Sequence, residues 1–104
     1  MELMTKELEE QIPIIYSQEN EGDPIAHCKF FTPDSSWRWF VLEYDPSKRL
    51  CFGYVCGMDN ELGYFNLDEL ESVTGPMGLH IERDLHWASR PLSKVKQDVK
   101  ELSG

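Results

Sequence analysis

Short connections between successive strand-like segments restrict what this chain can fold into more than any other feature. Apolar and aromatic residues fill four segments between residues 25 and 65, and the turns at residues 33–36 and 45–49 are rich in Pro, Asp and Ser. Adjacent parallel strands need a crossover of a dozen or more residues, whereas antiparallel strands can be joined by a few. The sequence therefore predicts an antiparallel meander.

Two patterns concern individual strands. In residues 50–57 the even positions are bulky while the odd side carries Gly53 and Gly57, which predicts that this side approaches another backbone closely. Residues 79–87 alternate between an apolar and a polar side. This alternation predicts a further strand with one side in the core, so we expect four to five strands in the sheet.

Capping residues indicate two helices before residue 80. Thr5 can cap a short helix at residues 6–11, whose first turns carry acidic residues. Asn66, followed three residues later by Glu69, gives the capping-box pattern for a short helix at residues 67–73.

A last helix is predicted after Pro91, and one of its faces is apolar. Its apolar residues are Leu92, Val95, Val99 and Leu102. The predicted fold class is therefore α+β, with an N-terminal helix, a short helix between strands and a C-terminal helix around an antiparallel sheet. We expect residues 1–104 to form a single domain.

The composition is typical of a soluble folded domain. Hydrophobic residues make up 40% of the chain and aromatic residues 12%, which can form a core without a metal or disulfide. No apolar run approaches the roughly 18 residues that span a bilayer, and the N-terminus is acidic where a signal peptide is basic. Cys28, Cys51 and Cys56 lack a metal-type spacing, so we expect reduced thiols in a cytoplasmic protein without a cofactor.

The charge balance narrows the classes of partner. Nineteen acidic residues against ten basic ones give a formal net charge of −9. Phosphate binding depends on Lys and Arg, so nucleic acid is not expected as a direct ligand, and neither is an anionic membrane. A protein with a basic surface is the partner that this charge favours.

The acidic residues between Leu50 and Glu82 are the strongest candidates for contacts with such a partner, because no Lys or Arg interrupts this stretch. If the turn near residue 60 and the short helix share a side, their carboxylates form a negative patch. The predicted contact residues in this stretch are Asp59, Glu61, Asp68, Glu69 and Glu71.

Aromatic residues offer anchors for an interface. Trp37 and Trp39 share one face of a predicted strand, and Tyr64 adds aromatic area. Core packing accounts for such residues in most folds, and Trp37 or Tyr64 at a protein interface is the functional interpretation. A single-stranded nucleic-acid binder that stacks bases on the tryptophans is an alternative, although only Lys29 and Arg38 lie near them in sequence.

Catalytic signals are weak. The sequence contains no nucleophile elbow, phosphate-binding loop or paired zinc-binding histidines, so it leaves an enzyme open without favouring one. A metal-binding module or small metal-dependent enzyme is the alternative, because two imidazoles and two carboxylates share the polar side of residues 79–87. Same-side residues on a strand lie about 6.6–7 Å apart, so one strand rarely supplies more than two ligands. The candidate ligands are His80, Glu82, Asp84 and His86.

A resemblance covers most of the chain. Residues 61–73, 75–79 and 81–85, together with residues 23–25 and 29–33 and the two tryptophans that follow, resemble the bacterial domain-of-unknown-function family 2958. The similarity extends from about residue 3 to residue 92, and the C-terminal helix departs from the family's pattern.

The resemblance implies a small accessory protein of a mobile genetic element such as a plasmid, integrative element or phage, with no catalytic residues to carry over. Together with the acidic charge, it leads us to expect a non-catalytic protein-binding module, monomeric or a small homo-oligomer, whose basic partner protein comes from the host or from the same element. Inhibition of a host defence or DNA-processing complex is the specific role that such a module would have.

Overall fold

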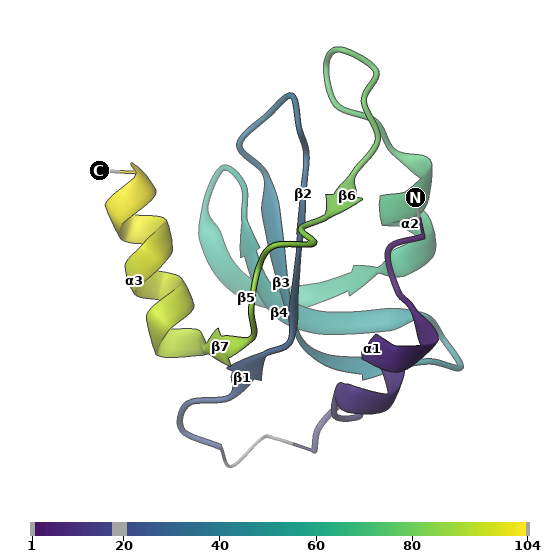
Figure 1. The fold of residues 1–104 in the computed structure, drawn as a ribbon, viewed down its shortest axis with the longest axis vertical. Helices are drawn as coiled ribbons and strands as arrows, with labels where there is room; N and C mark the ends of the chain where they lie inside the picture. The colour runs from purple at the N-terminus through teal and green to yellow at the C-terminus, as the bar shows by residue number, and fades with distance from the viewer. Residues whose placement is uncertain (1, 18–20, 104) are drawn as a thin grey trace.

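A five-stranded sheet forms the centre of the computed structural model, which describes residues 2–17 and 21–103, the last two by their backbone alone (Figure 1). Every neighbouring pair of strands is antiparallel, and β2 to β5 follow one another along the chain. The predicted antiparallel meander and the α+β class are confirmed. The order across the sheet is β5 (Asn60–Asn66), β4 (Leu50–Cys56), β3 (Arg38–Asp45), β2 (Cys28–Phe31) and β6 (Glu82–Arg83).

Gly53 lies in β4 where β3 passes very closely. A Cβ atom at Gly53 would lie 1.9 Å from the backbone carbonyl oxygen of Phe40. At Gly57 a Cβ atom would instead lie 2.3 Å from the Trp37 indole. The predicted close approach to another backbone is therefore confirmed at Gly53 and wrong at Gly57, where the neighbour is a side chain.

The first two helices begin at the predicted caps. In α1 (Lys6–Gln11), the N–H of Leu8 donates a hydrogen bond to Thr5 Oγ1 at 3.2 Å. In α2 (Leu67–Ser72), two N–H groups of the first turn donate to Asn66 Oδ1 at 2.8 and 3.3 Å. These bonds satisfy donors that a helix start would otherwise leave unpaired.

A small ribbon, β1 (Ile25–Ala26) paired with β7 (Arg90–Pro91), leads into α3 (Leu92–Ser103). Asp23 fixes this junction, because its two carboxylate oxygens accept bonds from Ser93 N at 2.9 Å and Ser93 Oγ at 2.7 Å. The predicted C-terminal helix is thus present, and Leu102 of its expected apolar face lies outside the described side chains. Within the described residues, no helix has the length and apolar character needed to cross a membrane.

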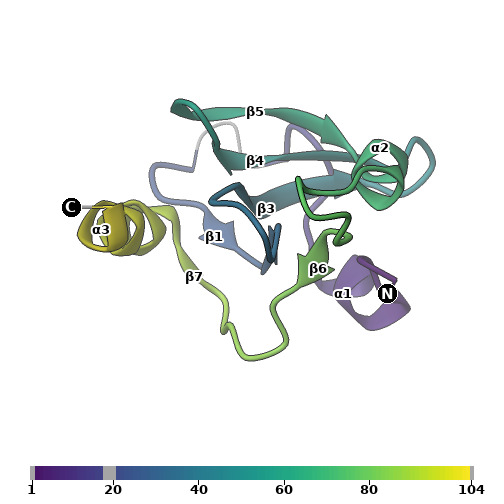
Figure 2. The ribbon, with the colours of Figure 1, turned by 90° about the horizontal axis from the view of Figure 1, so that it is seen from above.

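The sheet separates two hydrophobic cores, and α3 lies on one side of the molecule with α1 and α2 on the other (Figure 2). The first core joins the N-terminal segment and α2 to one sheet face, and the second joins α3 to the opposite face. The first includes Leu3, Phe30, Trp39, Tyr44 and Leu67, and the second includes Phe40, Leu42, Tyr54, Val95 and Val99.

The prediction of a continuous strand at residues 79–87 is wrong. Only Glu82–Arg83 is strand, because β6 pairs with two residues of β2 and the chain then turns at Asp84, whose Oδ1 accepts a hydrogen bond from His86 N at 3.0 Å. Ile81 belongs to the first core, whereas Trp87 packs against the second, on the other side of the sheet. The alternation in sequence is therefore a coincidence of spacing.

The three cysteines are predicted to resist thiol reagents in the native protein. Cys28, Cys51 and Cys56 are all buried, and burial raises the pKa of each thiol, that of Cys28 to about 12. The reactive thiolate is therefore scarce and shielded. We expect less than about one thiol per chain to react with a disulfide reagent near pH 8, and all of them after denaturation. Rapid reaction of the folded protein would contradict this packing.

Candidate functional site

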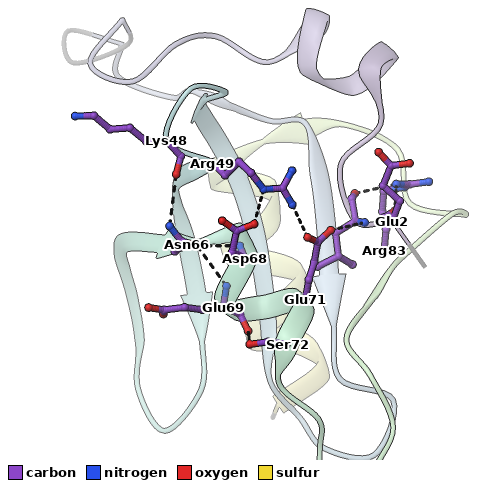
Figure 3. A network of polar contacts seen from close by, with 10 residues as sticks. Glu2, Lys48, Arg49, Asn66, Asp68, Glu69, Glu71, Ser72 and Arg83 are labelled. Carbon is purple, nitrogen blue, oxygen red and sulfur yellow. Dashed lines mark hydrogen bonds and ion pairs between the residues drawn. The ribbon is translucent and has the colours of Figure 1, made fainter.

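Asp68 and Glu71, two of the predicted acidic contact residues, are ion-paired with Arg49 (Figure 3). Arg49 Nε lies 2.6 Å from Asp68 Oδ1, and Arg49 Nη2 contacts Glu71 Oε1. Glu71 Oε2 also accepts a hydrogen bond from Leu3 N at 3.4 Å. These two carboxylates therefore attach α2 to the β3–β4 turn and to the N-terminal segment, and their charge is partly neutralised.

The other three acidic candidates, Asp59, Glu61 and Glu69, are exposed. Asp59 and Glu61 lie where β4 turns into β5, whereas Glu69 lies on α2 beyond the far end of β5 and points away from Arg49 (Figure 3). A seven-residue strand separates the two groups by about 20 Å. The structure thus places acidic groups at both ends of β5 and does not gather all five in one patch.

β5 is an edge strand, and in the described part of the chain β4 is its only neighbour in the sheet. Its sequence contains neither Lys nor Pro, the residues that commonly protect such edges. Leu62 is 47% exposed and Tyr64 50% exposed, and at the adjoining turn Met58 is 94% exposed. The Tyr64 ring contacts the rings of Phe52 and Tyr16, with distances between centroids of 4.9 Å and 6.4 Å.

The two predicted aromatic anchors lie on opposite faces of the sheet. Trp37 stacks on Trp39 with ring centroids 5.9 Å apart, and Trp39 belongs to the first core. Tyr64 packs on Phe52, which borders the second core. Trp37 and Tyr64 therefore cannot serve the same flat interface, and only Tyr64 projects beside the exposed strand.

The candidate metal ligands are not brought together. Residues 2–17 and 21–103 contain no group of three or more His, Cys, Asp or Glu side chains arranged to hold a metal ion. His80 forms a bridge with Thr74, and Glu82 lies in β6. Asp84 Oδ2 is 3.5 Å from Lys29 Nζ, and Asp84 Oδ1 binds the backbone of His86, so this carboxylate has partners within the chain.

One pocket was missed by sequence reasoning. It lies between α3 and the sheet, has a volume of about 360 Å³, and is lined in part by Lys29, Arg38, Trp87 and Arg90. Strand alternation places Arg38 on the same side of β3 as Phe40, and Lys29 of β2 faces that side too. This part of the pocket could have been predicted from the sequence. Trp87 and Arg90 come from an irregular connection, so no periodicity could have placed them there.

Comparison with known proteins gives a family and nothing narrower. A family model described as "Protein of unknown function (DUF2958)" matches residues 3–101. This match includes most of α3, so the expectation that the C-terminal helix departs from the family is wrong. No curated protein and no solved structure matches the chain.

Proposed function

The chain belongs to the DUF2958 family, and we propose that it is a protein-binding module whose β5 edge accepts an extended, basic segment of another protein. The observation that carries this proposal is that β5, a seven-residue strand with neither Lys nor Pro, pairs with β4 alone in the described part of the chain. An unpaired strand edge presents N–H and C=O groups that a second strand can bind by main-chain hydrogen bonds.

Side chains beside the edge supply the apolar part of the surface. Leu62 and Tyr64 project from the same side of β5, and contacts with Phe52 and Tyr16 restrict the Tyr64 ring before binding. A restricted aromatic ring loses little conformational entropy on binding, which makes it a suitable anchor.

Gly63, at the middle of β5, leaves room for the backbone of a bound segment to come close to this strand. A Cβ atom at Gly63 would meet nothing within 4 Å, so packing within the domain does not require glycine there. A glycine in a strand lets another chain approach the backbone closely. The position therefore fits an incoming segment better than it fits the needs of the isolated domain.

Charge selects the chemistry of the partner. Asp59 and Glu61 lie at the start of β5 and Glu69 beyond its end, and the chain has a formal net charge of −9. Lys and Arg side chains of a bound strand would meet carboxylates at both ends. Proteins that bind nucleic acid carry such basic segments, and inhibition of a DNA-processing or defence complex is the specific role that we propose for this module.

The test uses a capped peptide of alternating Lys and Val and hydrogen exchange of the β5 amides. We expect the peptide to slow exchange at residues 60–66 and to lose affinity steeply when salt rises from about 0.05 to 0.5 M. Leu62→Lys and Tyr64→Lys each place a positive charge at the edge, and each is expected to weaken binding at least about tenfold.

The matched control is Leu85→Lys, which adds the same charge at a residue that is 64% exposed. Leu85 lies in the connection between β6 and β7, on the opposite side of the molecule from β5 (Figure 2). The control should bind the peptide like wild type. The proposal fails if exchange at β5 is unchanged, if a Glu–Val peptide binds equally well, or if the control loses the same affinity.

A further inference from the structure

The pocket between α3 and the sheet combines an apolar wall with charged side chains, three basic and two acidic. Phe40 of β3 and Val95 and Val99 of α3 line it, and Trp87 closes it from the β6–β7 connection. The Phe40 and Trp87 rings contact each other, with centroids 5.7 Å apart and planes inclined by 53°. The basic residues that line the same pocket are Lys29, Arg38 and Arg90, and the acidic ones are Asp98 and Glu101 of α3.

Two of these cations already have partners. Arg90 Nη1 lies 2.9 Å from Asp98 Oδ2, and the Arg90 guanidinium lies 4.6 Å from the centre of the Trp87 ring. Lys29 Nζ lies 3.5 Å from Asp84 Oδ2. Each of these cations therefore has a carboxylate partner within the protein, although Asp98 also pairs with Lys94 Nζ at 3.2 Å.

Arg38 is different. Its Nε is buried and has no hydrogen-bond partner, and no ion pair joins it to any residue of the described chain. Glu101 also lines the pocket, and its Oε1 accepts a hydrogen bond from Gln97 Nε2 at 3.4 Å. A buried donor of a charged group without a partner is costly, and a bound oxygen atom would remove that cost.

We infer that this pocket binds a small organic anion, with a carboxylate or phosphate on Arg38 and an apolar body against Phe40 and Trp87. The guanidinium presents a planar fork of donors that matches two oxygen atoms at once. The volume of about 360 Å³ falls in the usual range for ligand pockets. Because the chain has a formal net charge of −9, nonspecific attraction of anions elsewhere is weak, and binding should be local.

The position of Arg38 supports this assignment. Arg38 and Lys29 also line a second hollow of about 160 Å³, so both residues border two hollows. Its neighbours across the sheet are Phe31 of β2 and Cys56 of β4, and neither side chain offers a strong acceptor. An external anion is therefore the natural partner for this side chain.

The test titrates the protein with 2-naphthoate, the neutral amide 2-naphthamide and inorganic phosphate, and follows ¹H–¹⁵N spectra. We expect 2-naphthoate to shift the Arg38 Nε–H and Trp87 indole N–H signals saturably, with weaker effects from phosphate. Arg38→Gln should weaken naphthoate binding at least about tenfold, while the other signals of the spectrum remain those of the folded protein. Arg38→Lys keeps the charge without the planar fork, so its affinity for naphthoate should lie between those of wild type and Arg38→Gln.

Lys48→Gln is the matched control, since it removes one positive charge from an exposed turn outside the pocket. It should bind naphthoate like wild type. The inference is overturned if no signal shifts, if 2-naphthamide binds as tightly as 2-naphthoate, if phosphate alone binds as tightly, or if Lys48→Gln has the same effect as Arg38→Gln. Protein folding is checked independently in each spectrum, so a misfolded variant is recognised and replaced by Arg38→Lys.

Discussion

Gly53→Ala is expected to lower the free energy of unfolding by at least about 3 kcal/mol. The added methyl group would lie 1.9 Å from the carbonyl oxygen of Phe40, which is a backbone atom of the adjacent strand. A side chain could rotate away, but this oxygen belongs to the β3–β4 ladder at the middle of the sheet. The strands would have to separate, and urea unfolding followed by circular dichroism measures the loss.

The matched control lies directly across the ladder. Gly63 of β5 pairs with Gly53, and a methyl group there meets nothing within 4 Å. Gly63→Ala is expected to raise the free energy of unfolding by about 0.5–1 kcal/mol, because alanine has less freedom than glycine in the unfolded chain. Equal losses from the two substitutions would contradict the close contact at Gly53.

Phe30→Ala is expected to lower the free energy of unfolding by about 3–5 kcal/mol. Phe30 is 0% exposed and lies in the first core, where it packs between β2 and the segments that cover that face. Its removal leaves a cavity as well as a loss of buried apolar area. Thermal and urea unfolding both measure this effect.

Phe31→Ala serves as the control for this substitution, because it removes the same side chain one residue along β2. Phe31 points to the other face, is partly exposed, and lies under Lys29 Nζ at 5.8 Å from the ring centre. Its loss is expected to cost only about 1 kcal/mol. If Phe31→Ala were the more damaging of the two, β2 would have to lie in the opposite register to the one described.

Local signals were sufficient to predict most of the fold. The turns at residues 33–36 and 45–49 are too short for parallel crossovers, so the strand order followed from chain order. Thr5 and Asn66 set the starts of α1 and α2 because caps act within one turn of a helix. Such features depend on residues close together in sequence.

The prediction failed where a distant partner decides the outcome. Residues 79–87 have the alternation of a strand, yet only Glu82 and Arg83 pair with β2 before the chain turns at Asp84, so β6 is two residues long. The period of side chains shows which residues could share a face. It does not show how much of a neighbouring strand is available for pairing.

The candidate surfaces were predictable only where they depend on residues close together in sequence. Exposure of Asp59 and Glu61 at a turn follows from local sequence, but the pairing of Glu71 with Arg49 joins residues 22 positions apart. Arg38 in a pocket could not be foreseen, because its surroundings come from β2, α3 and the β6–β7 connection. Pockets are formed by tertiary packing, and a single sequence contains little information on it.

The contact of Arg83 with the start of the chain has a consequence during synthesis. Arg83 Nη1 donates hydrogen bonds to the carbonyl oxygens of Glu2 at 2.9 Å and Leu3 at 2.8 Å, across a separation of 80 residues from Leu3. A ribosome adding about 5–20 residues per second needs roughly 4–16 s to cover that distance. For this interval the carbonyl oxygens of Glu2 and Leu3 lack their Arg83 donor, so this part of the N-terminal segment completes its contacts only after residue 83 has been made.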